Sequence, residues 1–169
     1  MSTIGIVAGF GAGSAAAIGA ALLLRRRRII IQVRGESMYP ALRHGDRLLV
    51  RPCEAAEVSV GDIVVIESPG RDLSWTTPPA TRWTRDRRWL VKRVVAVPGD
   101  RRPDVLPAVT RVPEVVAPKT LIVLSDNGGL DSRVFGPIPF ERLFGVAVRR
   151  MFDERGGGRE AIRRDAPSP

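Results

Sequence analysis

The stretch WLVKRVVAV, residues 89–97, decides the fold. In an extended chain successive side chains point to opposite sides, so Leu90, Lys92, Val94 and Ala96 share one face. Both faces are largely apolar, which predicts a strand that is buried on both sides. Lys92 is the exception, because it places a charged side chain in an otherwise apolar row.

Five further runs are typical of strands, and turn residues separate them. Long helical patterns are missing between them, and Pro and Gly are frequent while aromatic residues are few. This spacing predicts an all-β body, either folded antiparallel sheets or a partly closed barrel. The runs are 29–33, 46–50, 61–67, 120–126 and 142–152.

Composition limits the chemistry. The single cysteine, Cys53, excludes an intrachain disulfide, and the single histidine, His44, limits histidine chemistry to one position. The net charge of +9 suits phosphate partners, either nucleic acid or anionic lipid. Nearly all the basic residues are arginines, because Lys92 and Lys119 are the only two lysines.

The ends of the chain differ from the body. Residues 4–24 form an uncharged run of 21 residues, long enough to cross a bilayer as a helix. We therefore expect a membrane anchor with its basic flank over 1–28 and a β-rich domain over 29–152. We expect a disordered tail over 153–169, which is rich in Gly, Pro and charge.

Residues 68–88 interrupt the strand pattern with tryptophans, a Pro-Pro pair and a cluster of arginines. Three interpretations remain open. A long hairpin loop would cover a sheet edge. Contact with a membrane interface would use indole rings and arginines. Nucleic-acid binding would use the same residues for stacking and phosphate contacts, and is the least favoured.

Ser37 lies in VRGESMYPALRHGD, residues 33–46, at a corner between a strand and a turn. A serine hydroxyl is a poor nucleophile unless a base takes its proton. His44 is better explained as a solvated turn residue than as that base, and Cys53 as a small, partly buried thiol. Lys92 is the alternative base, because burial disfavours an ammonium and lowers its pKa. Taken alone, Lys92 is better explained as a lysine that reaches solvent from a strand edge.

Five segments appear in the order of the sequence boxes of type I signal peptidases: GESMYPAL, GDRLLV, GDIVVI, VKRVVAVPGD and SDNGGLDSRVFGPIP. The chain resembles this family over about residues 29–148, and especially its compact branch, which includes the mitochondrial inner membrane peptidases. The resemblance implies a membrane-anchored serine protease with a Ser-Lys dyad on an all-β fold, without metal or cofactor.

The resemblance also implies roles for particular residues. Ser37 would be the nucleophile, with its backbone N–H helping to stabilise the oxyanion, and Lys92 would be the general base. A supporting ion-pair set would comprise Arg93, Asp131 and Arg133. Shallow pockets for small side chains would be lined by Val33, Leu42 and Val91.

Two positions depart from the family pattern. Gly35 stands where some members have a hydroxyl that completes the oxyanion hole. Gly129 stands where members have a serine that orients the lysine, and the spacer before Asp131 is short. A hydroxyl from Ser125 or Ser132 would have to replace it, or the dyad is held less firmly.

These observations predict a membrane-anchored endopeptidase that removes leader peptides from precursor proteins, with small residues such as Ala one and three positions before the cut. A dedicated maturation protease for one precursor would use the same residues. A self-cleaving repressor would need a DNA-binding domain where residues 4–24 lie. A non-enzymatic basic adaptor at the membrane would leave Ser37 and Lys92 unexplained.

The expected side of the membrane depends on which argument is used. Arg25–Arg28 follow the apolar run and no basic residue precedes it, so the charge rule places the body in the cytoplasm. The resemblance implies the extracytoplasmic face of the cell membrane, where leader peptides are cleaved. We expect the extracytoplasmic face, because the substrate class requires it.

Overall fold

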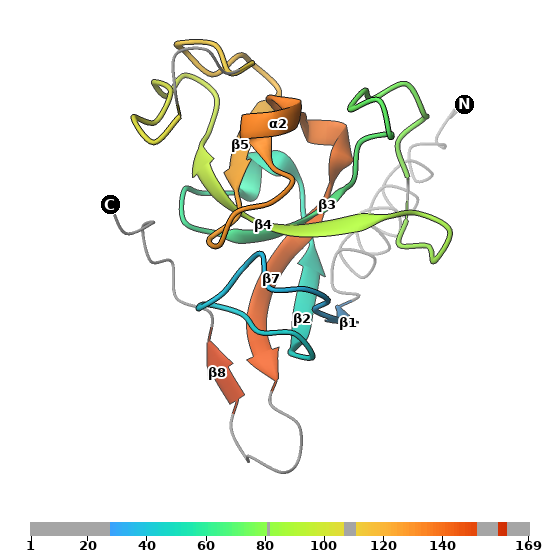
Figure 1. The fold of residues 1–169 in the computed structure, drawn as a ribbon. Coiled ribbons are helices and arrows are strands. Elements are labelled where there is room, and N and C mark those ends of the chain that lie inside the picture. The colour runs from blue at the N-terminus through green and yellow to red at the C-terminus, as the bar shows by residue number, and fades with distance from the viewer. Residues whose placement is uncertain (1–27, 81, 107–110, 152–158, 162–169) are drawn as a thin grey trace, which may run out of the picture.

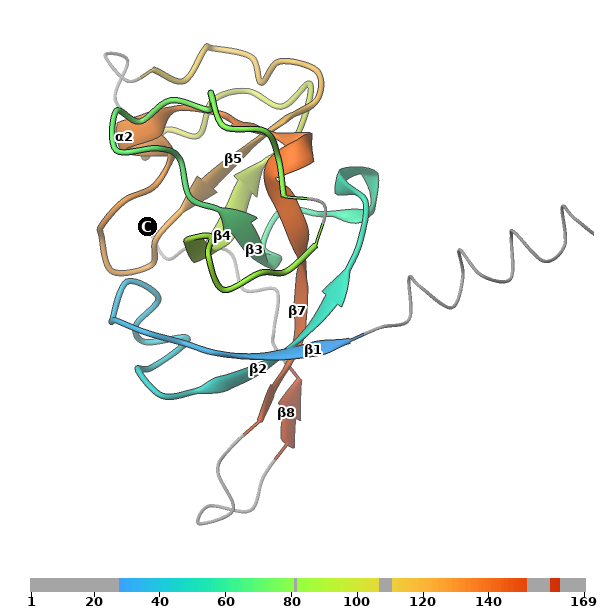
Figure 2. The ribbon, with the colours of Figure 1, turned by 90° about the vertical axis from the view of Figure 1, so that its right-hand side faces the viewer.

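The computed structural model describes residues 28–80, 82–106, 111–151 and 159–161. The strands lie in one curled sheet in which every pairing is antiparallel (Figures 1 and 2). Its order is β1-β2-β7-β3-β4-β5-β6, with β8 paired to β7. The strands are β1 (Ile29–Gln32), β2 (Arg47–Pro52), β3 (Ile63–Glu67), β4 (Trp89–Ala96), β5 (Thr120–Leu124), β6 (Ile138–Pro139), β7 (Leu143–Met151) and β8 (Arg159–Ala161).

Helical structure among the described residues is limited to single turns: η1 (Ala55–Glu57), α2 (Ser132–Phe135) and η2 (Phe140–Arg142). None of the described helices is long and apolar enough to cross a membrane. The expected anchor over residues 4–24 lies outside the described residues.

The all-β fold predicted from the strand pattern is confirmed, and each of the six predicted runs overlaps a strand. Short elements were missed, because two or three residues are too few to show a period. Within the tail expected to be disordered, Arg159–Ala161 form β8 against β7. The expectation of disorder was wrong for this segment, because composition carries no information about its backbone pairing with β7.

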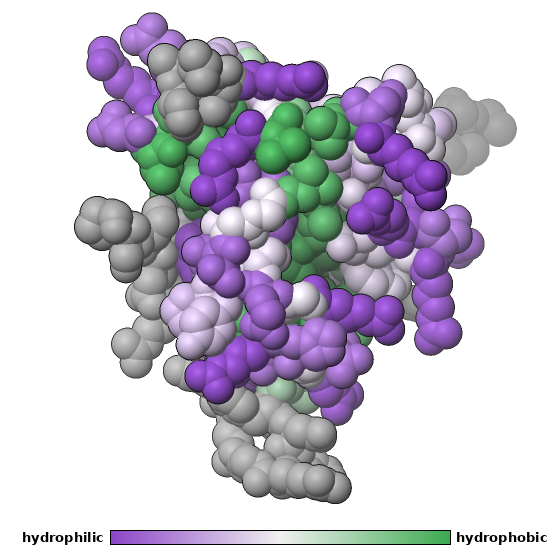
Figure 3. All heavy atoms as spheres, in the orientation of Figure 1, coloured by the Kyte–Doolittle hydropathy of each residue, from purple (hydrophilic) through white to green (hydrophobic). Residues whose placement is uncertain are grey.

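The core lies on both sides of β3. Ile63 and Val65 pack into one apolar cluster with residues of β1 and β2, while Val64 and Ile66 pack into a second cluster with β4 and β5. Alternation along a strand produces this division. In β4 the second half is buried as predicted, but Trp89, Leu90 and Val91 are only half-buried. On the face shown in Figure 3, hydrophobic side chains gather over α2 and β5 and hydrophilic ones surround them.

Candidate active site

Ser37 lies in the connection between β1 and β2, which folds back on itself. Val33 donates to the carbonyl of Asp46 at 2.8 Å, and Gly45 donates to the carbonyl of Val33 at 3.0 Å. Gly35 makes the turn with a φ of 89°, a conformation that favours glycine. Its N–H donates to Nδ1 of the exposed His44 at 3.1 Å, so this histidine braces the turn.

The segment 125–131 lies beside the Ser37 turn in both ribbon views (Figures 1 and 2). Asn127 donates its backbone N–H to the carbonyl of Ser37 at 2.9 Å and its side-chain amide to the carbonyl of Glu36 at 3.2 Å. These two bonds join the turn to the end of β5. Asn127 was not singled out in the sequence, and its only signal was its place in SDNGGLDSR, directly after a buried strand.

Lys92 reaches Ser37 from β4, 55 positions along the chain, with Nζ 3.2 Å from Oγ. Only 2% of the lysine is exposed. Burial lowers its pKa below the ordinary value, and the nearby Arg133 acts in the same direction, while Asp131 and Asp126 oppose the shift. An amine that loses its proton more readily, placed within hydrogen-bond reach of a hydroxyl, is able to accept that hydroxyl's proton.

Two ion pairs flank this contact. Asp131 is fully buried, and its carboxylate accepts from the Arg133 guanidinium at 2.6 Å and from the Ser125 N–H at 2.9 Å. Burial raises the pKa of Asp131, but these bonds outweigh burial and the net pKa is lowered. Arg93 binds Asp126 through two bonds of 2.9 and 2.7 Å. The predicted set of Arg93, Asp131 and Arg133 thus forms two pairs, the second completed by Asp126.

A groove of about 730 Å³ runs past Ser37 and Lys92. Val33 and Val91 line it, together with residues of β1, which ends the sheet order at this side. Leu42 is not among the lining residues; at 1% exposed, it packs in the core cluster behind them. Of the three positions considered for small pockets, two therefore face the groove.

The connection 68–88 forms the far wall of the groove through Trp83, Thr84, Arg85 and Arg87. Trp83 stacks on Trp89 with ring centroids 4.7 Å apart. In the structure this segment is the long connection of the β3–β4 hairpin, in agreement with one of its three interpretations.

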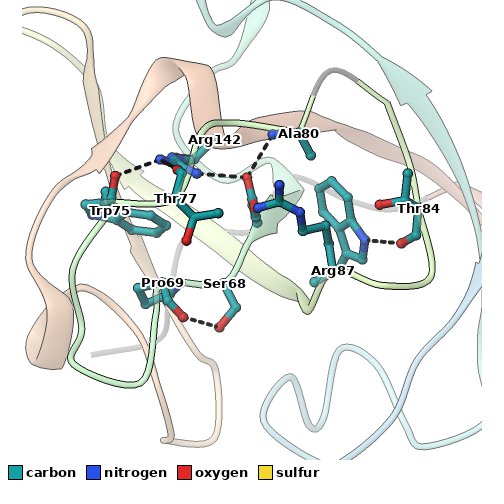
Figure 4. Close-up of polar contacts among 10 residues, drawn as sticks. Ser68, Pro69, Trp75, Thr77, Ala80, Thr84, Arg87 and Arg142 are labelled. Carbon is teal, nitrogen blue, oxygen red and sulfur yellow. Dashed lines mark hydrogen bonds and ion pairs between the residues drawn. The ribbon is translucent and has the colours of Figure 1, made fainter.

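Buried polar contacts hold this connection in place (Figure 4). Glu67 accepts from Arg142 at 3.0 Å, from Arg87 at 2.8 Å and from the N–H of Ala80 at 3.1 Å. Arg142 also donates to the carbonyls of Trp75 and Thr77. The signal for this arrangement in the sequence was weak, because Glu67 and Arg142 are 75 positions apart.

No group of three or more His, Cys, Asp or Glu side chains within the described ranges is placed to hold a metal ion. The chemistry that the described residues offer is that of a hydroxyl beside a buried amine.

Comparison with known proteins identifies the class. The family model described as "Signal peptidase, peptidase S26" matches residues 9–101, a range that includes both Ser37 and Lys92. The chain is also 30% identical over 128 residues to the mitochondrial ATP-independent inner membrane protease subunit 1a of Arabidopsis thaliana, which covers 71% of this chain and 68% of that protein. The chain belongs to the signal peptidase family, peptidase S26, a family of peptidases.

Proposed function

We propose that the chain is a membrane-anchored serine endopeptidase that removes leader peptides from precursor proteins, with Ser37 as nucleophile and Lys92 as general base. The observation that supports it most is the 3.2 Å contact between Lys92 Nζ and Ser37 Oγ, two residues that line a groove. The lowered pKa of Lys92, caused first by burial, favours the neutral amine that a base requires.

The first half of the reaction acylates the enzyme. The neutral Lys92 amine takes the proton of the Ser37 hydroxyl while Oγ attacks the scissile carbonyl carbon. The oxyanion that forms is stabilised by the Ser37 backbone N–H. The Lys92 ammonium then gives its proton to the leaving amine, the C–N bond breaks, and the acyl group remains on Ser37.

The second half of the reaction releases the acyl group from Ser37. A water molecule loses a proton to Lys92 and attacks the acyl carbon, and the ester bond to Ser37 breaks as Oγ takes that proton back. Lys92 ends neutral and Ser37 ends protonated, ready for the next substrate. An extended precursor segment along β1 would present its side chains to Val33 and Val91, which favours small residues near the cut.

Substitution of the two lysines tests the assignment, because arginine keeps the charge but does not give up its proton near neutral pH. With the full chain in detergent and a quenched fluorescent peptide carrying Ala one and three positions before the cut, Lys92→Arg should lower kcat by about 100-fold or more. Ser37→Ala should reduce cleavage to background. The matched control, Lys119→Arg, alters an exposed lysine and should keep most activity.

The pH dependence adds a second criterion. Wild-type cleavage should rise with pH as Lys92 loses its proton. If Lys92→Arg cleaves at nearly the wild-type rate, Lys92 is not the base. A preference for bulky aromatic residues at the two positions would contradict the role of the groove.

A further inference from the structure

Ser125 carries a buried hydroxyl that the reaction described above does not use. The residue is 6% exposed, and its Oγ has no hydrogen-bond partner among the described residues. Buried hydroxyls are nearly always paired, so an exception calls for a physical reason.

Ser125 is the first residue after β5, and the register of the β4–β5 ladder points to Lys92 as its neighbour. In the β4–β5 ladder Arg93 lies opposite Leu124 and Val94 opposite Val123, and continuing that register by one residue sets Lys92 opposite Ser125. Opposite residues in an antiparallel pair share a face, with Cβ atoms about 5 Å apart. The register shift of this ladder falls between Val94 and Ala96, at the end away from Lys92.

The backbone of Ser125 is held by Asp131. Its N–H donates to the fully buried Asp131 carboxylate at 2.9 Å, and the side chain of Ser125 takes no part in this bond. Rotation about χ1 is then the movement that remains open to Oγ.

Gly129 leaves room on the Ser37 side. A Cβ added to Gly129 would lie 3.6 Å from Cβ of Ser37 and 3.7 Å from Oγ of Ser125, so this glycine borders both serines. Its φ of +118° is a conformation that L side chains rarely adopt. The position is therefore unsuited to supply a hydroxyl, and the hydroxyl of Ser125 lies next to it.

We propose that Ser125 is a positioning residue for Lys92, with its Oγ accepting an N–H of the amine and thereby turning the nitrogen lone pair toward the Ser37 hydroxyl. The inference rests on the proposed function. A neutral amine has two N–H groups and one lone pair, so an acceptor for an N–H restricts where the lone pair points. The contact closes when χ1 of Ser125 rotates, and hydrogen bonds in active sites commonly tighten only when substrate is bound.

Ser132 carries the other hydroxyl considered for orienting Lys92, but it is engaged elsewhere. Its Oγ accepts from the N–H of Val123 at 3.0 Å, which joins the start of α2 to β5. Ser132 is also buried, but its hydroxyl binds the backbone, which makes it the matched control.

The experiment compares Ser125→Ala with Ser132→Ala in the full chain, measuring kcat and KM for the same peptide between pH 6 and 10. We expect Ser125→Ala to lower kcat about 10- to 100-fold, the loss of one hydrogen bond to a group that becomes charged, with KM within about twofold. An oxygen acceptor favours the ammonium, so its removal should also move the rising limb of the pH profile to lower pH.

The other charged groups around Lys92 remain in the variant, so the shift is specific to the hydroxyl. On the segment after β5 they are Asp126, Asp131 and Arg133, and along the groove they are Arg34, Arg85 and Arg87. Ser132→Ala should lower the melting temperature but leave kcat and the pH limb unchanged.

A second pair of variants separates the hydroxyl from packing. Ser125→Thr and Ser125→Val have nearly the same shape, but only Thr keeps the hydroxyl. Cleavage should persist in Ser125→Thr and fall in Ser125→Val. Equal rates in the pair, or a lower kcat in Ser125→Ala with an unmoved pH limb, would overturn the positioning role. Loss of cleavage in Lys92→Arg with full activity in Ser125→Val would retain the proposed function and reject this inference alone.

Discussion

Lys92 is a basic side chain placed in an apolar row, and its burial should be visible in stability as well as in activity. Because burial lowers its pKa, the folded chain releases this proton at a lower pH than the unfolded chain does. Between the lowered pKa and about 10.4, the reference value for lysine, the unfolded state binds more protons. The free energy of unfolding should therefore rise with pH across this window.

Lys92→Met should remove that contribution, which has a maximum slope of about 1.4 kcal/mol per pH unit for one proton. Urea denaturation between pH 7 and 10 measures it. Lys119→Met, which removes the other lysine of the chain from an exposed position, serves as the matched control. A wild-type slope that survives in Lys92→Met would show that the lysine titrates alike in both states.

At this scale the sequence predicts part of the site and misses another part. Ser37 and Lys92 drew notice because one lies at a turn and the other interrupts an apolar row, but their roles were assigned only through the resemblance to type I signal peptidases. Asp126 and Asn127 lacked such a signal, since their roles depend on which strand ends lie side by side. The sequence left Ser125 and Ser132 as alternative hydroxyls near Lys92. The proposal for Ser125 uses the register between β4 and β5, which the sequence does not show.

The β3–β4 connection over 68–88 is held in place by the buried carboxylate of Glu67. Glu67 joins Arg142 beside β7 to Arg87 within the connection, and Arg142 is only 3% exposed. Glu67→Gln would leave that guanidinium buried without its counter-charge. We expect a loss of about 3–5 kcal/mol in the free energy of unfolding, measured by urea denaturation.

The control is Glu57→Gln, which alters an ion pair with Arg51 whose side chains are 34% and 41% exposed. Exposed pairs contribute about 0–1 kcal/mol, so this variant should remain near wild type. If Glu67→Gln were equally harmless, the connection would be held by its aromatic contacts instead. Cleavage by Glu67→Gln should fall as well, because the connection forms one wall of the groove.

The longer strands were predictable as apolar runs bounded by turn residues, whereas the contacts that hold the long connection over 68–88 were not. Its tryptophans suggested contact with lipid or nucleic acid, but Trp83 stacks on Trp89 and Trp75 packs edge-on against Phe135. Composition indicates what indole rings are able to do, and only the fold decides which neighbour they meet.

The whole chain combines a basic β-rich body with the uncharged run of residues 4–24. If that run anchors the protein, the full chain should remain in the membrane pellet after alkaline carbonate extraction. Ala16→Arg together with Ile18→Arg should release it, because each arginine near the centre of a span costs about 2.5–3.5 kcal/mol on insertion scales. Release of the wild type under the same conditions would argue against an anchor.

The face of the membrane is decided in the same preparation. Protease added to intact cells should digest the body if it lies on the extracytoplasmic side, as leader-peptide cleavage requires. Protection until the membrane is opened would favour the cytoplasmic side, which the charge of Arg25–Arg28 indicates.

Gly145 occupies the point where β7 pairs with Pro52 of β2 on one side and with Val65 of β3 on the other. A Cβ there would overlap the carbonyl oxygen of Arg51, because real Cβ atoms essentially never come so close to a backbone oxygen. β2 follows the connection that contains Ser37, and β3 is paired with β4, which contains Lys92. The proposed alignment of Ser37 with Lys92 therefore depends on a close approach of β2 to β7 that a side chain at Gly145 would prevent. Substitution of Gly145 by Ala tests how much displacement of these strands the proposed reaction tolerates.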